Sequence, residues 1–305
     1  MTSLSEKSYW KIGGNCNNFN EVNDHNELYD VVIKNEKIIT IGNGTNILFD
    51  SNGYDGCIVK LGSGFRYINL INDDEIEVGA SYPIPHLVRF LSKNGLGGID
   101  HCIGIPATLG GLVTMNGGSQ RRSISENIIS VNTIDHKGKI KIFSCDDCKF
   151  GYRDSIFKNN ELIITSVRLK LDKINPNSNR TNLLNILSER RNKFPRKIPN
   201  CGSVFKSSPE LFEKLGPPGA IIESLGLKGL RVGGAEISKL HANFILNTDS
   251  ATSDDIISIV SKINKACYEK FAIELKSEAI FYDKGGEVYQ LEEIARIKDK
   301  NQRLL

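Results

Sequence analysis

The residues best suited to chemistry lie in a short, turn-rich loop at positions 199–206. Ser203 follows a glycine there and precedes Lys206 by three residues. A positioned hydroxyl can donate a proton, and a lysine offers a compact positive charge to an anion. A turn hydroxyl has the same appearance, because serine readily bonds nearby backbone groups. The loop therefore predicts a proton donor only if other segments supply a cofactor and a substrate site.

An adjacent tyrosine and arginine form a second candidate, in a loop-like segment. Arg153 follows Tyr152 and precedes Asp154. The planar guanidinium fork suits a carboxylate or phosphate, so Arg153 is a candidate anchor for an anionic substrate. A surface ion pair with Asp154 or Glu161 is the alternative interpretation.

Two glycine-rich segments could hold a phosphorylated cofactor. Residues 42–46 follow a predicted strand, where backbone N–H groups can approach a phosphate, but a third glycine and a following helix are missing, so this is no Rossmann fingerprint. Residues 104–119 contain two double glycines, which allow close approach to a flat ring or a diphosphate. A tight turn explains the first segment equally well, and close packing explains Gly110 and Gly111 but explains 116–119 less well.

The length of the chain permits an enzyme, and its composition excludes some other classes. The 305 residues suggest two or three domains, and 39 basic against 36 acidic side chains give a net charge of +3, which argues against a nucleic-acid or membrane-surface protein. Residues 1–7 lack the apolar core of a secretion signal, and no apolar run approaches the roughly 20 residues that span a bilayer. We therefore expect a cytoplasmic protein with no membrane insertion and no nucleic-acid partner.

Seven cysteines are scattered through the chain and do not suggest a disulfide framework. Cys145 and Cys148 have the spacing of a redox or metal pair. A second pair and a flanking histidine are missing, so we interpret the spacing as chance and expect no metal site.

Hydrophobic patterns predict the following elements. In the first half we expect strands at 31–33, 37–41 and 47–49, a helix at 84–94 closed by Gly95, and a hairpin of 128–134 with 139–143 around 135–138. In the second half we expect a polar linker at 172–179, helices at 180–193 and 253–271, a strand at 275–282 and a charged helix at 288–305.

Five motifs in one order resemble those of UDP-N-acetylenolpyruvoylglucosamine reductases (UDP-N-acetylmuramate dehydrogenases), in the shorter subclass of that family. They occupy 41–48, 104–118, 152–158, 201–206 and 233–245, and the resemblance extends from about residue 11 to about residue 282. Five ordered matches are far more specific than any one of them.

The resemblance implies NADPH-dependent, FAD-mediated reduction of UDP-N-acetylglucosamine enolpyruvate to UDP-N-acetylmuramate, a step in peptidoglycan precursor synthesis. FAD and NADPH are the implied cofactors and a nucleotide sugar the substrate. The implied fold is α+β, with a two-domain FAD-binding part of the PCMH/VAO-like type and a C-terminal α+β substrate-binding domain. We place FAD-binding subdomains at 1–60 and 61–175, the substrate domain at 176–283 and a tail at 284–305, to which we assign no role.

The resemblance also implies roles for residues. Ser203 is the implied proton donor, Arg153 the brace for the enolate-like carboxylate, and Glu278 an assistant at the same centre; without the resemblance, Glu278 would be an exposed strand carboxylate. The implied substrate contacts are Tyr152, Lys206 and Asn243. The implied cofactor contacts are Gly42, Asn43, Gly44, Thr45, Asn46, Gly104, Ile105, Thr108, Gly110, Gly111, Asn116 and Gly118.

Four positions depart from the family pattern. Ala107 replaces a usual glycine, Thr45 a common serine, and Ser207 with Ser208 a polar or basic residue followed by proline. Thr45 keeps the hydroxyl, whereas Ala107 adds a methyl group near the expected flavin. A related FAD-dependent oxidase, or a paralogue that uses another nucleotide sugar, is the alternative function.

Overall fold

The computed structural model describes residues 1–159 and 161–302. The chain forms two compact units: unit 1 comprises 1–18, 44–56 and 193–305, and unit 2 comprises 19–43 and 57–192. Both contain helices and sheets, which confirms the predicted α+β class. The finer division at residues 60, 175 and 283 stays a prediction.

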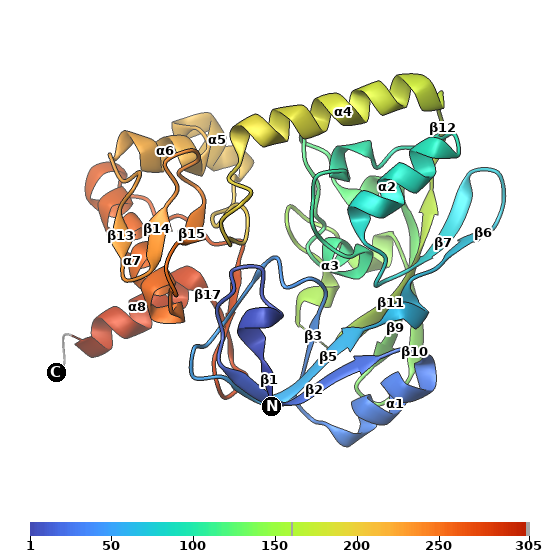
Figure 1. Cartoon of the computed structure of the whole chain (residues 1–305), viewed down its shortest axis with the longest axis horizontal. Helices are drawn as coiled ribbons and strands as arrows, with labels where there is room; N and C mark the ends of the chain where they lie inside the picture. Colours follow the sequence, from blue (N-terminus) through green and yellow to red (C-terminus); the bar gives the residue numbers. More distant parts are fainter. Residues whose placement is uncertain (160, 303–305) are drawn as a thin grey trace. The chain divides into compact units, whose positions relative to one another are not determined.

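Unit 2 is built on a five-stranded antiparallel sheet in the order β10-β9-β11-β7-β6 (Figure 1). Its strands are β6 Ile68–Leu70, β7 Glu75–Gly79, β9 Ile128–Asp135, β10 Ile140–Ser144 and β11 Leu162–Lys170. The predicted hairpin is confirmed, because β9 pairs with β10 around a turn in which Gly138 has a positive φ of 74°. The short helix α3 (Leu109–Thr114) packs against β7 and β11.

The strand predicted at 31–33 is wrong, because these residues belong to helix α1 (His25–Lys34). Asp24 caps the helix by accepting hydrogen bonds from the backbone of Asn26 and Glu27. Leu28 and Val32, four residues apart, bury one face of the helix. Local β-branched propensity is therefore overridden by the N-cap and by this apolar stripe. The strands predicted on either side of the glycine loop are confirmed as β3 (Ile38–Ile41) and β4 (Ile47–Phe49).

The linker predicted at 172–179 is only partly correct. Asp172–Lys173 forms the short strand β12, and helix α4 (Pro176–Lys193) begins four residues before the predicted helix. Asn175 caps it through its side chain, and the buried Asn179 donates to Ser92 of helix α2. Packing against α2 (Ile84–Lys93), itself correctly predicted, therefore turns a polar, turn-like sequence into the first helical turn.

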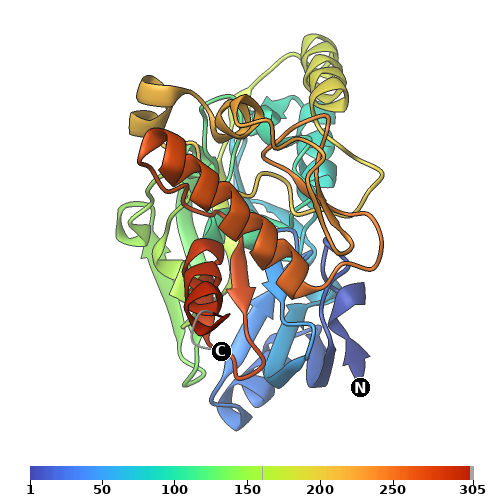
Figure 2. The same ribbon diagram turned by 90° about the vertical axis from the view of Figure 1, so that its left-hand side faces the viewer.

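Unit 1 contains the predicted helix α7 (Ser253–Phe271), which lies beside α8 (Leu291–Gln302) in Figure 2. The strand predicted at 275–282 is shorter, β16 (Ile280–Tyr282), and it lies between β17 (Val288–Gln290) and β4. The predicted tail helix therefore begins three residues late, after β17. Its last residues, 303–305, lie outside the described part of the chain.

The remaining strands and α-helices complete the two units. They are β1 Thr2–Ser3, β2 Asn15–Val22, β5 Tyr54–Leu61, β8 Leu96–Gly97, α5 Pro209–Leu215, α6 Pro218–Ser224, β13 Arg231–Val232, β14 Ala235–Ile237 and β15 Ile245–Asn247. Trp10 is fully buried in the core of unit 1, and its ring N–H donates to Ile245 O at 2.7 Å. No helix among the described residues is long and apolar enough to cross a membrane.

Candidate functional site

In unit 1, the Ser203 loop runs antiparallel to the segment that carries Glu278. Phe205 and Ser277 form a β-bridge. On one side of this bridge Glu278 N donates to Val204 O at 2.7 Å, and on the other Lys206 N donates to Lys276 O at 2.8 Å. The structure therefore brings together the backbones of two candidate catalytic residues that are 75 positions apart in the sequence.

The Ser203 hydroxyl is half-buried and has no hydrogen-bond partner among the described residues. The preceding Gly202 has φ +84°, and a Cβ built on it would meet nothing within 4 Å. Its backbone N–H donates to Asn200 Oδ1, which shapes the turn. A small hydroxyl beside open space, on a turn that is itself fixed, is suited to contact a ligand.

Asn243 holds this loop with both ends of its side-chain amide. Phe205 N donates to Asn243 Oδ1, and Asn243 Nδ2 donates to Phe205 O, each at 2.9 Å. Asn243 is 5% exposed, and its own carbonyl accepts from Val204 N. These bonds favour a positioning role over the predicted direct contact with substrate.

The Glu278 backbone is held on both sides. Its N–H bonds to Val204, and its carbonyl accepts from Asn46 Nδ2 at 2.9 Å. Burial, and after it the Glu278 charge, raises the pKa of the Cys201 thiol well above its ordinary value. The Glu278 carboxylate therefore lies near the start of the Ser203 loop. Asn46, predicted as a cofactor contact, here supports Glu278.

Arg153 lies in a tight turn of unit 2. Gly151 and Asp154 exchange two backbone hydrogen bonds, and Arg153 between them has φ +54°. A non-glycine residue in this left-handed region is uncommon and is often found at functional sites. Its guanidinium carbon lies 5.3 Å from the ring centre of the exposed Tyr152. Asp154 itself lies 3.5 Å from Lys158 Nζ.

The Arg153 fork points into the second glycine segment. Its Nη1 donates to Asn116 O at 3.3 Å and its Nη2 to Gly118 O at 2.9 Å. Asn116 has φ +41° and donates in turn to Gly151 O. The structure therefore unites two motifs that the sequence offered separately. The buried His101 lies beside this cluster, and burial followed by the Arg122 charge lowers its pKa to about 4.

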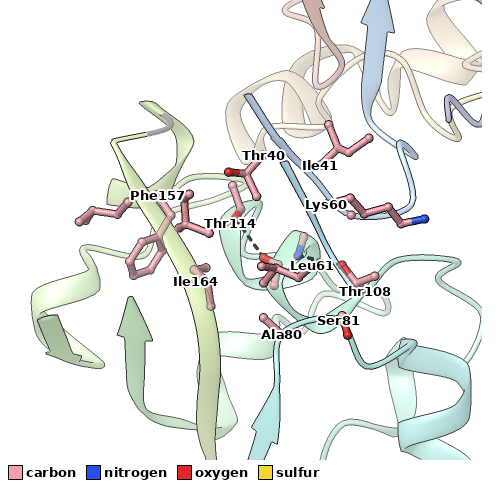
Figure 3. Close-up of a pocket in the computed structure, with 15 residues that line it drawn as sticks. Thr40, Ile41, Lys60, Leu61, Ala80, Ser81, Thr108, Thr114, Phe157 and Ile164 are labelled. Carbon is pink, nitrogen blue, oxygen red and sulfur yellow. Dashed lines mark hydrogen bonds between the residues drawn. The ribbon is translucent and has the colours of Figure 1, made fainter. Parts of the chain in front are cut away.

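Four of the predicted cofactor contacts surround a cavity of about 70 Å³ in unit 2: Gly42, Thr108, Gly110 and Gly111. Figure 3 shows Thr108 and Ser81 on one side of it and Phe157 and Ile164 on the other. A cavity lined by both polar and apolar side chains suits a flat, polar-edged ring system. Thr40, Lys60 and Ser81 also line it and were not predicted, because single polar residues, two of them in strands and Ser81 in the turn after β7, carry no motif.

The cavity wall fits FAD in two respects. A Cβ at Gly42 would collide with Thr108 Oγ1, so only glycine leaves that hydroxyl in place to cap α3 through Gly111 N. The Thr40 hydroxyl is buried without a partner among the described residues, although buried polar groups are normally hydrogen-bonded. A ligand with polar edges would satisfy it. Gly110, by contrast, is explained by packing, because its Cβ would lie 3.1 Å from Ala80 Cβ.

The remaining predicted cofactor contacts are more widely placed. Asn43 Nδ2 donates to Pro106 O, which links the two glycine segments of unit 2. Gly44, with φ +64°, belongs to unit 1 together with Thr45 and Asn46, and Gly44 O accepts from Tyr9 N. The structure describes the two units separately, so it does not group these residues with the cavity.

Gly104, which precedes Ile105, lies beside a cation that the sequence did not single out. A Cβ on Gly104 would collide with the side chain of Arg190 from α4. Burial lowers the pKa of that guanidinium, and the Cys102 thiol is the opposing influence. The only signal in the sequence was the arginine doublet at 190–191, which lies within the helix predicted at 180–193.

Two of the departures from the family pattern, Ala107 and Ser208, fit their local surroundings. Ala107 is 6% exposed and its methyl group belongs to the core of unit 2. Ser208 caps α5, because its Oγ accepts from Leu211 N at 3.3 Å.

Cys145 and Cys148 are free thiols, and burial raises the pKa of both, that of Cys148 to about 12.

Comparison with known proteins agrees with this arrangement. Residues 194–282 match the family model for the C-terminal domain of UDP-N-acetylenolpyruvoylglucosamine reductase, and residues 23–144 match an FAD-binding domain. The UDP-N-acetylenolpyruvoylglucosamine reductase 1 of Corynebacterium glutamicum is 41% identical over 96% of this chain and 88% of its own length. The reductase of Prochlorococcus marinus NATL2A is 35% identical over 90% of this chain and 94% of its own length.

A solved structure is also similar. The crystal structure of UDP-N-acetylenolpyruvylglucosamine reductase from Thermus caldophilus has a TM-score of 0.80 and 28% identity, and the match covers 92% of this chain and 97% of that one. Sequence, domain content and fold thus agree over nearly the whole chain. The chain therefore belongs to the UDP-N-acetylenolpyruvoylglucosamine reductase family.

Proposed function

We propose that this protein is an FAD-containing, NADPH-dependent oxidoreductase that reduces UDP-N-acetylglucosamine enolpyruvate to UDP-N-acetylmuramate in peptidoglycan precursor synthesis. The observation that carries the proposal is the pairing of the Ser203 loop with the Glu278 segment in a member of this family. The cavity bounded by Gly42, Thr108 and the unpartnered Thr40 hydroxyl supports FAD as the cofactor.

Bound FAD, once reduced by NADPH, would supply the hydride that adds to the terminal carbon of the enol ether. Addition leaves negative charge on the neighbouring carbon and on the substrate carboxylate. Arg153 is proposed to stabilise that carboxylate, since a guanidinium fork matches its two oxygens. Its φ of +54° and its bonds to Asn116 and Gly118 fix the fork in one direction.

Ser203 is proposed to donate the proton that completes the lactyl ether, and solvent then restores its hydroxyl. A serine hydroxyl is a weak acid, so the step requires a strongly basic carbanion and close positioning. Bonds from Asn200 and Asn243 to the loop supply the positioning. Glu278 is proposed to assist at the same carbon, and Tyr152 and Lys206 to contact the nucleotide sugar.

Separated half-reactions test the proposal. Under anaerobic conditions NADPH should bleach the absorbance of bound FAD, and the enolpyruvyl nucleotide sugar should restore it. Ser203→Ala should leave bleaching nearly unchanged and slow the return of colour by about 10²- to 10⁴-fold, the usual contribution of a positioned acid. Equal slowing of both halves would count against Ser203 as the acid. Rapid oxygen consumption without NADPH would favour an oxidase instead.

A further inference from the structure

The segment that follows the matched C-terminal domain is hydrogen-bonded to Ser277, the residue that precedes Glu278. The match to the family's C-terminal domain ends at residue 282, whereas the chain continues through β17 and α8 to residue 302. Strand β17 pairs antiparallel with β16, with Gln290 opposite Ile280. The chain therefore turns back, and the first turn of α8 lies beside Ser277.

Ser277 and α8 satisfy each other's backbone groups. Ser277 N donates to Glu292 Oε2 at 2.9 Å, and Leu291 N donates to Ser277 Oγ at 2.9 Å. The first amides of a helix lack partners within the helix, so Ser277 supplies one. Ser277 is fully buried and Glu292 is 3% exposed. Removal of either side chain would leave a buried donor unpaired, which is unfavourable.

These bonds restrain the chain on both sides of Glu278. The Ser277 hydroxyl also lies 3.1 Å from Ala279 O, on the far side of Glu278. The 276–277 peptide, through Ser277 N, and the 279–280 peptide, through Ala279 O, are thereby linked to α8, whereas the two peptides that flank Glu278 bond to Val204 and Asn46. Since peptide groups are planar and joined at the Cα atoms, holding residues 277 and 279 limits how far the backbone at Glu278, between them, can turn.

A second contact ties α8 to the same segment. Arg296 Nε lies 3.4 Å from Glu274 Oε1, two residues before Lys276. This pair is partly exposed and contributes little by itself. It shows, however, that α8 follows residues 274–278 for more than one turn.

We propose that residues 288–302 act as a latch on residues 274–279, and that Glu292 is a positioning residue for Glu278. The inference rests on the role proposed above for Glu278 and extends it to a part of the chain without an assigned role. Glu292 contacts neither substrate nor cofactor in this proposal. It acts by holding the Ser277 amide.

Three variants of the full-length, FAD-loaded protein test the latch. Glu292→Ala removes the acceptor, whereas Glu292→Gln keeps an oxygen that can accept from Ser277 N. Glu293→Ala is the matched control: it lies in the same turn of α8, but it is exposed and its carboxylate accepts from Gln290 N instead.

In stopped-flow experiments, Glu292→Ala should slow reoxidation of the flavin by the enolpyruvyl nucleotide sugar about 10- to 100-fold, as small misplacements of reacting groups do. In Glu292→Gln the rate of flavin reoxidation should stay within about 3-fold of the wild-type rate, because the hydrogen bond from Ser277 N survives. The rate of flavin reduction by NADPH should change less than about 2-fold in every variant. Glu293→Ala should have wild-type rates in both half-reactions. Hydrogen exchange of peptides that cover 277–279 should accelerate in Glu292→Ala alone.

The proposal would be overturned if Glu292→Ala reoxidised its flavin at the wild-type rate, or if both half-reactions slowed equally. If Glu292→Ala fails to fold, Ser277→Ala takes its place, since it keeps the Ser277 N–H but removes the bond to Leu291 N. It too must slow reoxidation selectively, or the latch is refuted. If the wild-type flavin stays reduced with the nucleotide sugar, the proposed function fails instead, and hydrogen exchange still decides whether the latch exists.

Discussion

Replacement of Asn243 by alanine offers a sharp test of how the Ser203 loop is held. The side-chain amide of Asn243 bonds the N–H and the C=O of Phe205, both at 2.9 Å, in the core of unit 1. Phe205 is 1% exposed, so water cannot replace these bonds without a structural change. The substitution should therefore act on stability and on loop position together.

The magnitude follows from the two backbone groups that lose their partner. Each buried, unpaired group costs about 1–3 kcal/mol, and partial relaxation of the loop reduces the sum. We expect Asn243→Ala to lower the free energy of unfolding of unit 1 by about 2–4 kcal/mol. Because the loop carries Ser203, flavin reoxidation should slow as well, with kcat changing more than KM for the nucleotide sugar.

Trp10 provides the assay. It is the single tryptophan of the chain, it is fully buried in unit 1, and its ring N–H bonds to Ile245 O, next to Phe244 and two residues from Asn243. Its fluorescence during urea denaturation reports the unfolding of this unit. Asn301→Ala, at an exposed position on α8, is the matched control and should leave the urea midpoint unchanged.

Two outcomes would refute this reasoning. An unchanged urea midpoint would mean that the paired hydrogen bonds contribute no net stability. A normal urea midpoint with a raised KM and an unchanged kcat would instead support the direct contact between Asn243 and substrate that the sequence predicted.

Two further predictions concern unit 2. Gly42→Ala should displace the Thr108 hydroxyl and weaken FAD binding by about 1–3 kcal/mol, measured by titration of the apoprotein, whereas Gly285→Ala, whose Cβ meets nothing closer than 3.6 Å, should not; equal affinities would contradict the steric argument. The pKa of His101 is lowered from 6.5 to about 4, so the unfolded state binds more protons between these values and stability falls as pH decreases from 6.5 to 4, by at most about 3 kcal/mol. In thermal denaturation, His101→Gln should flatten the dependence of stability on pH between 4 and 6.5. Parallel stability profiles for the wild type and His101→Gln would refute the role of His101.

The sequence predicted local structure well where neighbouring residues decide it. The helix at Ser253–Phe271 follows from an apolar stripe and a threonine cap, and the turn at Gly138 follows from a residue that tolerates positive φ. It failed at 31–33, where β-branched propensity competed with the Asp24 cap, and at 172–179, where burial of Asn179 against α2 extends the helix.

In the candidate site, too, the sequence did not predict what depends on tertiary contacts. Motif order indicated the family and named Ser203, Arg153 and Glu278, but gave no reason why Asn116 lies beside Arg153. It also gave no role to Thr40, Arg190 or Glu292, which belong to no motif. Their significance comes from what surrounds them: an unpaired buried hydroxyl, a glycine that leaves room for a guanidinium, and a buried amide that requires an acceptor.

The sequence alone thus determined the positions where glycine, serine and arginine can act, because turn geometry and side-chain chemistry are local properties. Tertiary structure decided which of these groups are held in place. The bonds of Asn243 to Phe205 span 38 residues and those of Glu292 to Ser277 span 15. Such pairs form because buried backbone groups must find partners wherever the folded chain supplies them, and no local pattern specifies where that will be.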